Sequence, residues 1–134
     1  MHESVAAGLA GAAVSGLPST VVALVEGDDV LEGARAAGAM ILPGERRSLA
    51  LLAAGGIAHV AISLGWAAVL TAVLPRGREP VTGVAAGLVI AALDLGIIGR
   101  RIPAIRALSQ PRQWADHAAY GLTVGLVLRV RRAS

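Results

Sequence analysis

Three long stretches of the chain contain almost no charged residues, and they constrain the fold more than any other feature. Residues 4–25 and 48–74 contain no Asp, Glu, Lys or Arg, and residues 81–99 contain only Asp94. A helix needs about 20 apolar residues to cross the hydrocarbon core of a bilayer. Because a spanning segment must satisfy its own backbone hydrogen bonds, we expect each stretch to be a transmembrane helix.

A fourth apolar stretch, residues 114–128, is shorter and begins with Asp116 and His117. It can span a bilayer if its first turn lies among the headgroups and Arg129 extends to the other interface. The predicted fold is therefore all-α, with four transmembrane helices in one integral membrane domain, residues 1–134. No basic residue precedes the first stretch, so we expect a retained helix rather than a cleaved signal peptide.

The composition supports a membrane protein and argues against two other classes. Hydrophobic residues make up 55% of the chain and charged residues 16%, whereas soluble domains have about 25% charged residues. All 12 basic residues are Arg and lie between apolar runs, without the interleaved aromatic residues of a nucleic-acid binder. The chain has no Cys, which excludes disulfides, thiolate zinc sites and a Cys nucleophile.

The connections between the predicted spans differ in length. Residues 26–47 begin with acidic residues, and we expect a short helix over 31–42, capped by Asp28 or Asp29, at the membrane interface or over the bundle end. Residues 75–80 form a tight turn, and residues 100–112 carry four Arg and two Pro. Arg residues are divided five against seven between the two sides, so they predict no orientation.

The two halves of the chain resemble each other. Residues 6–9 and 12–15 (AAGL, AAVS) align with residues 85–88 and 91–94 (AAGL, AALD), and His59 aligns with His117. The alignment predicts two parallel helical hairpins related by an axis along the membrane normal. The first unit covers about residues 4–74, with the insertion 26–47, and the second covers about residues 81–130.

Small residues recur along the first and third predicted spans. Glycines at such spacing let helix backbones approach closely in lipid, where apolar surface alone drives no association. We therefore expect these two helices to form the central pair of the bundle, packed through Gly8, Gly11, Gly16, Gly83 and Gly87.

The alignment also predicts one layer of polar side chains inside the membrane. At 1.5 Å per residue, Asp94 lies roughly 8 Å from one end of its span, and Ser15, His59 and His117 match it in depth. Ser63 follows His59 by four residues and shares its helix face. Asp116 is expected to point away from this layer, toward headgroups or Arg112.

Several interpretations of this layer stay open. A charged carboxylate in hydrocarbon costs ~2.5–3.5 kcal/mol on insertion scales, so Asp94 is either a proton relay or cation ligand, or a buried hydrogen-bonding partner of His117 or Ser15. The two histidines suit a proton relay or interhelical hydrogen bonds. They also suit a divalent metal held with Asp94, or both axial positions of a haem.

The chain resembles the YagU-type family of small bacterial inner-membrane proteins, whose molecular function is not established. The resemblance covers about residues 50–132 and rests on these positions: His59, Ser63, Leu74-Pro75, Gly83, Ala86-Gly87-Leu88, Asp94, His117, Gly121 and Val127-Leu128-Arg129. It implies a multi-pass protein of the bacterial inner (plasma) membrane and no reaction. The acidic stretch 26–29 departs from the family.

These observations predict a non-enzymatic membrane protein that translocates or senses protons or a small cation through Ser15, His59, Ser63, Asp94 and His117. No Gly-rich phosphate loop and no Gly-flanked nucleophilic Ser is present. One alternative is an accessory or scaffold subunit of a membrane complex. Another is a haem- or metal-binding protein that uses His59, His117 and, for a metal, Asp94. A bundle of this size is small to enclose a path alone, so we expect a homo-oligomer or a larger complex.

Overall fold

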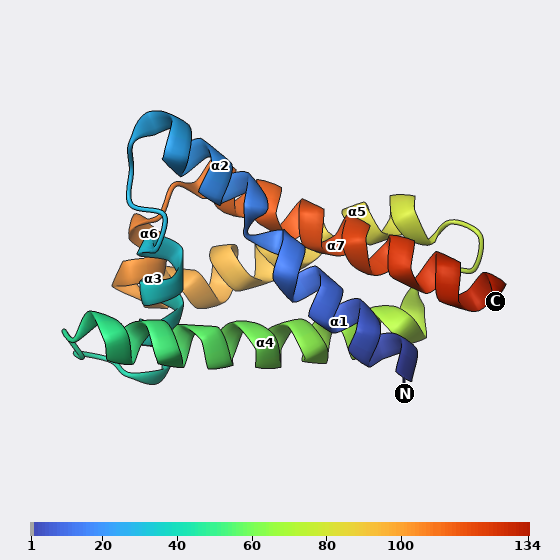
Figure 1. Cartoon of the computed structure of the whole chain (residues 1–134), viewed down its shortest axis with the longest axis horizontal. Coiled ribbons are helices and arrows are strands. Elements are labelled where there is room, and N and C mark those ends of the chain that lie inside the picture. Colours follow the sequence, from blue (N-terminus) through green and yellow to red (C-terminus); the bar gives the residue numbers. More distant parts are fainter. Residues whose placement is uncertain (1) are drawn as a thin grey trace.

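The computed structural model describes residues 2–134, and these residues form helices and connecting turns without any strand. In chain order the elements are α1 (His2–Ser15), α2 (Leu17–Glu26), α3 (Glu32–Ile41), α4 (Ser48–Val73), α5 (Glu79–Leu93), the π-helical turn η1 (Asp94–Ile98), the 3-10 turn η2 (Gly99–Arg101), α6 (Pro103–Ala107) and α7 (Gln110–Ala133). In Figure 1, α4 runs along one side of the molecule, with α3 and α6 at one end. The start of α1 and the end of α7 lie at the other end.

Three helical segments of the described chain are long and apolar enough to cross a membrane. They are His2–Glu26, Ser48–Val73 and Glu79–Arg101, and they coincide with the three long uncharged stretches of the sequence. The predicted fourth span falls within α7, which has 24 residues but is polar at both ends. Four spans and the internal repeat therefore stay predictions.

The first apolar segment is interrupted between α1 and α2. Gly16 separates the two helices, and Pro18 lies in the first turn of α2. Proline has no N–H and its ring clashes with the carbonyl four residues earlier, which ends a helix before it. The break therefore lies at Gly16, two residues before Pro18.

The short helix α3 packs across the N-terminal part of α4 by close backbone contact. A Cβ atom on Gly38 would lie 2.0 Å from the carbonyl oxygen of Leu51, and one on Gly55 would lie 2.0 Å from that of Ala34. The predicted capping differs, because Leu31 caps α3 and the Asp29 carboxylate instead accepts a hydrogen bond from the Leu31 N–H at 2.9 Å.

The most extensive helix contact joins α5 to α7 rather than the first and third spans, so the predicted central pair was wrong. Cβ atoms on Gly83 and Gly87 would lie 2.3 and 2.2 Å from the carbonyl oxygens of Gly121 and His117. On the α7 side, Gly121 faces Gly83 and Gly125 faces Glu79. Small residues on both helices permit this close approach of the backbones. The prediction from the sequence used the glycines of α5 but not those of α7.

Helix α1 lies between α4 and α7 and uses its own glycines there. Gly8 contacts Leu64 and Ala67 of α4, and Gly11 contacts the Tyr120 ring of α7. Gly16, expected to pack, meets nothing within 4 Å because it lies at the break between α1 and α2. The main core cluster joins α1, α4, α5 and α7 through buried side chains: Ala7, Ala67, Leu70, Leu74, Ile90, Tyr120, Val124 and Leu128.

We predict that Gly121→Ala destabilises the fold by about 1–3 kcal/mol, because the new methyl group overpacks the contact with Gly83. The matched control is Gly56→Ala on α4, where the added Cβ meets nothing within 4 Å. This control should be neutral or slightly stabilising, since Ala is favoured over Gly in helices by about 1 kcal/mol. Unfolding in mixed detergent micelles, followed by circular dichroism, measures both. Equal effects of the two variants would contradict the packing assignment.

Candidate functional site

The polar residues singled out in the sequence surround one cavity of about 610 Å³. It lies toward the end of the molecule where α3 and α6 are found, and both helices contribute to its wall (Figure 1). Its lining includes all five predicted layer residues: Ser15, His59, Ser63, Asp94 and His117. Within the cavity four of these residues form two separate pairs, Ser15 with His59 and Asp94 with His117, and Ser63 belongs to neither pair.

The first pair joins α1 to α4. The Nε2 atom of His59 lies 2.9 Å from the carbonyl oxygen of Ala12 and 3.4 Å from the Ser15 hydroxyl. A carbonyl oxygen only accepts hydrogen bonds, so Nε2 of His59 carries the proton of the neutral ring. The other nitrogen, Nδ1, is then the basic one.

The second pair joins α5 to α7 and carries the opposite tautomer. The Nδ1 atom of His117 lies 2.8 Å from the carbonyl oxygen of Gln113 and must donate to it. The basic nitrogen is therefore Nε2, which lies 3.5 Å from Oδ2 of Asp94. A proton on this nitrogen is held directly opposite a carboxylate.

The backbone is irregular at Asp94. This residue begins η1, where the N–H of Gly99 bonds to the carbonyl oxygen of Asp94, five residues earlier. Such π-helical turns are rare and often occur at functional sites. This π-helical turn directly follows α5, whose glycines permit the close approach to α7.

Asp116 also lines the cavity, so its expected orientation toward headgroups or Arg112 was wrong. Its Oδ1 atom accepts a hydrogen bond from the N–H of Ser19 at 2.8 Å. Ser19 lies in the first turn of α2, where backbone donors have no partner within the helix. Pro18 was the available signal, because a break in the helix creates donors that need an acceptor. Arg112 instead pairs with Glu26 and Asp28.

Ser63 is a buried polar residue of the cavity whose side chain has no hydrogen-bond partner in the described chain. The residue is 5% exposed, and its hydroxyl makes no hydrogen bond to any residue within 2–134. Its backbone carbonyl accepts a hydrogen bond from the Tyr120 hydroxyl. Because no fully buried side-chain oxygen in the described chain lacks a partner, the Ser63 hydroxyl retains access to the cavity.

The side chains as arranged do not form a metal or haem site. Among the described residues no three His, Cys, Asp or Glu side chains are grouped to hold a metal ion, which includes His59, Asp94 and His117. A haem iron bound by both histidines needs a free basic nitrogen on each, directed at one point. Nε2 of His59 bonds to a carbonyl and Nε2 of His117 faces Asp94, so the two Nε2 atoms are both engaged within the chain in this arrangement.

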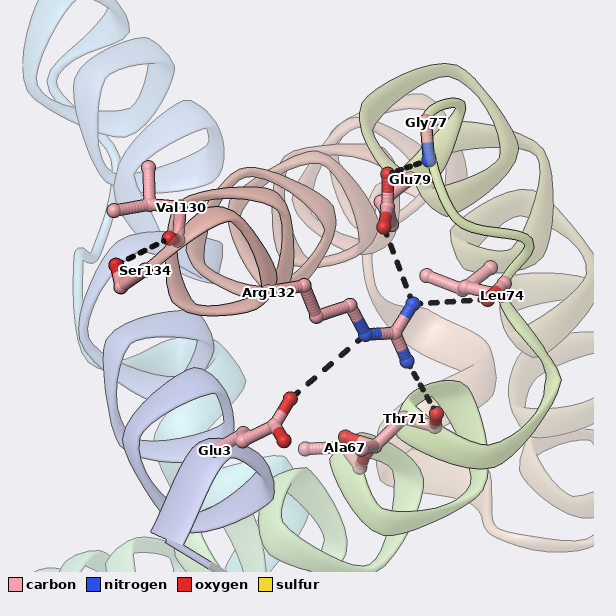
Figure 2. A network of polar contacts seen from close by, with 9 residues as sticks. All are labelled: Glu3, Ala67, Thr71, Leu74, Gly77, Glu79, Val130, Arg132 and Ser134. Atoms are coloured by element: carbon pink, nitrogen blue, oxygen red, sulfur yellow. Dashed lines mark hydrogen bonds and ion pairs between the residues drawn. The ribbon is translucent and has the colours of Figure 1, made fainter.

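A buried ion pair that the sequence did not predict lies at the end of the molecule opposite to the cavity. Figure 2 shows the Arg132 guanidinium between Glu79 and the end of α4. Its nitrogens lie 3.2 Å from Oε1 of Glu79 and 3.0 Å from the Leu74 carbonyl oxygen, and they also bond to the Thr71 carbonyl. A second Glu79 oxygen accepts the Gly77 N–H at 2.7 Å. Arg132 thus satisfies the free carbonyls at the end of α4 and ties α7 to the α4–α5 turn.

The signal for this pair was Glu79 itself. It is the only acidic residue in the predicted turn and is 1% exposed in the structure. A carboxylate buried to this degree needs a basic partner, and the C-terminal arginines were the candidates.

Comparison of the chain with protein-family models, with curated proteins and with solved structures finds no match. The YagU-type resemblance therefore stays a prediction.

We predict that Arg132→Met lowers the melting temperature by on the order of 10 °C, because it leaves the buried Glu79 carboxylate uncompensated. Arg131→Met is the matched control, since the neighbouring side chain is exposed. Thermal unfolding in detergent, followed by circular dichroism, distinguishes them. The ion pair would have no stabilising role if both variants melted like the wild type.

Proposed function

We propose that this chain is a non-enzymatic, multi-pass membrane protein that takes up and releases a proton at the His117–Asp94 pair, as a proton translocator or sensor does. The observation that carries the proposal is the facing of the basic His117 nitrogen and the Asp94 carboxylate, 3.5 Å apart, on the wall of a cavity. Histidine titrates near neutral pH, and the two groups can share one proton.

The proposed position of the pair inside the membrane favours a single bound proton. With one proton the pair is neutral overall, as an ion pair or as two uncharged groups. Without it, a net negative charge is left in a region where charge is costly. Proton release therefore requires water or another cation to reach the pair, and the cavity supplies that access.

Four transmembrane helices are part of this proposal, with α7 as the fourth. Helix α7 contacts α1, α2 and α5. Because these neighbours cover part of its surface, less of that surface faces lipid and has to be apolar. Trp114 near its start and Arg129 and Arg131 near its end suit the two membrane interfaces. The resemblance to YagU-type proteins favours the inner (plasma) membrane of a bacterium.

The internal duplication is also supported. Each half joins the aligned residue of its first helix to the aligned histidine of its second helix, Ser15 to His59 and Asp94 to His117. The helix also loses its regular form at both aligned positions, since α1 ends at Ser15 and η1 begins at Asp94. Of the two aligned positions, only the one in the second half is a carboxylate. Each chain therefore has one proposed proton site.

No specific observation favours an accessory subunit. The glycines expected to pack against partner helices, Gly83 and Gly87, are used inside the chain against α7. Assembly into an oligomer remains part of the proposal because the bundle is small, and the open glycine Gly65 of α4 is where close contact with another helix is sterically possible.

The test is infrared difference spectroscopy of the protein in liposomes between acidic and alkaline pH. We expect a carboxylic-acid band that disappears in Asp94→Asn and shifts in its titration in His117→Gln, because His117 is the partner of the carboxylate. Glu45→Gln, in the exposed connection between α3 and α4, should keep the wild-type band.

A second measurement separates a translocator from a sensor. Liposomes containing a pH-sensitive dye and an imposed membrane potential report proton flux, which should fall at least tenfold in Asp94→Asn if the protein translocates protons. A wild-type spectrum without any band sensitive to Asp94→Asn would refute the proposed proton site.

A further inference from the structure

We propose that the cavity binds a lipophilic organic cation, in which a positively charged centre near Asp94 and Asp116 is attached to an apolar body. This inference rests on the proposed function only because both assign a role to Asp94. It names the class of ligand whose positive charge would take the place of the bound proton. It is carried by the cavity's size, charge, wall chemistry and one unsatisfied hydroxyl.

The cavity is much larger than proton transfer requires. Its volume of about 610 Å³ falls in the range of roughly 300–1,000 Å³ typical of small-molecule sites. A water molecule occupies only about 30 Å³ of liquid volume, so a short chain of water to the His117–Asp94 pair would leave most of the space unused.

The charge of the lining favours a cation. Four carboxylates line the cavity, those of Asp29, Glu32, Asp94 and Asp116, against one arginine, Arg112. Asp29 is paired with Arg35, and Arg112 is shared by Glu26 and Asp28 outside the lining. Glu32, Asp94 and Asp116 are left without an arginine partner, so the lining is net negative and attracts positive charge.

The remaining wall suits an apolar ligand body. Most of the lining surface is apolar, and the aliphatic residues that contribute to it include Leu52, Ile62, Ile90, Leu95, Ile105 and Leu108. The whole chain has only two Trp, one Tyr and no Phe, yet Trp66 and Tyr120 both line this cavity. Aromatic rings attract organic cations through their faces and also bury apolar groups.

The Ser63 hydroxyl is the independent sign of a ligand site. The Ser63 residue is 5% exposed and lines the cavity, and its hydroxyl makes no hydrogen bond to the described chain. Buried hydroxyls normally have a partner. Its oxygen lies on the same cavity wall as the carboxylates, where it would contribute a further negative dipole toward a bound cation.

The test compares two ions of nearly equal shape and opposite charge, tetraphenylphosphonium and tetraphenylborate, binding to the detergent-purified protein. An ion-selective electrode measures the first and equilibrium dialysis measures both. We expect tetraphenylphosphonium to bind at least tenfold more tightly than tetraphenylborate. Equal binding of the two ions would mean that the cavity selects apolar surface alone, and would overturn the proposal.

Two variants locate the cation. Asp94→Asn and Asp116→Asn should each weaken tetraphenylphosphonium binding about tenfold, whereas Glu45→Gln should bind like the wild type. Asp116→Asn is the more decisive variant, because the Asn side-chain oxygen can still accept the Ser19 hydrogen bond while the charge is lost. Unchanged binding in a folded Asp116→Asn protein would overturn the assignment even if Asp94→Asn failed to fold.

The proton and cation proposals can fail separately. Wild-type protein that keeps the infrared band of Asp94 but does not bind tetraphenylphosphonium would refute the cation site and leave the proton site standing. Bound cation without a titrating Asp94 would do the reverse. Competition by phosphatidylethanolamine, but not by phosphatidylglycerol, would support the cation site and identify its natural ligand as a lipid headgroup.

Discussion

The close approach of the α5 and α7 backbones is the constraint on which the rest of the structure depends. Gly83 and Gly87 contact the carbonyl oxygens of Gly121 and His117, a contact that any side chain at the two glycines would obstruct. It brings the backbone of His117 against the helix that carries Asp94, two turns beyond Gly87. Helical side chains lean toward the N-terminus, so the imidazole reaches back to Gln113 and toward Asp94. The proton site is therefore a consequence of glycine packing.

The sequence predicts which polar residues lie around one cavity better than it predicts the partner of each helix. Uncharged stretches follow from the cost of charge in lipid, and helical rise puts Ser15, His59, Asp94 and His117 at one level. Rotation about a helix axis and the choice of neighbour depend on both surfaces of a contact. The glycines of α5 were therefore recognised, but their partners Gly121 and Gly125 were not, and the central pair was misassigned.

The contacts of Asp116 and Glu79 were not predicted from the sequence, and both failures have the same physical cause. Both carboxylates satisfy groups that a chain break exposes, the Ser19 N–H after the α1–α2 interruption and the Gly77 N–H in the α4–α5 turn. Hydropathy values describe the free-energy cost of burying a carboxylate. They do not show that an unpaired backbone N–H is present nearby, whose hydrogen bond to the carboxylate offsets that cost. Pro18 and the turn around Gly77 mark where those groups arise, so breaks in predicted spans are the places to look for polar partners.

The two ends of the molecule differ, and this difference bears on how a proton could cross. Near the α3–α6 end the cavity gives access to His117 and Asp94. Beyond them the core closes with Tyr120, Val124 and Leu128, all buried, and the Tyr120 hydroxyl bonds to the Ser63 carbonyl at the cavity floor. The Arg132–Glu79 pair then ties the far end together. The cavity thus gives the proposed proton site access from the α3–α6 side, which is sufficient for a sensor. A translocator would have to separate α1 from α7 at the contact of Gly11 with Tyr120, because that contact lies directly between the cavity and the closed core.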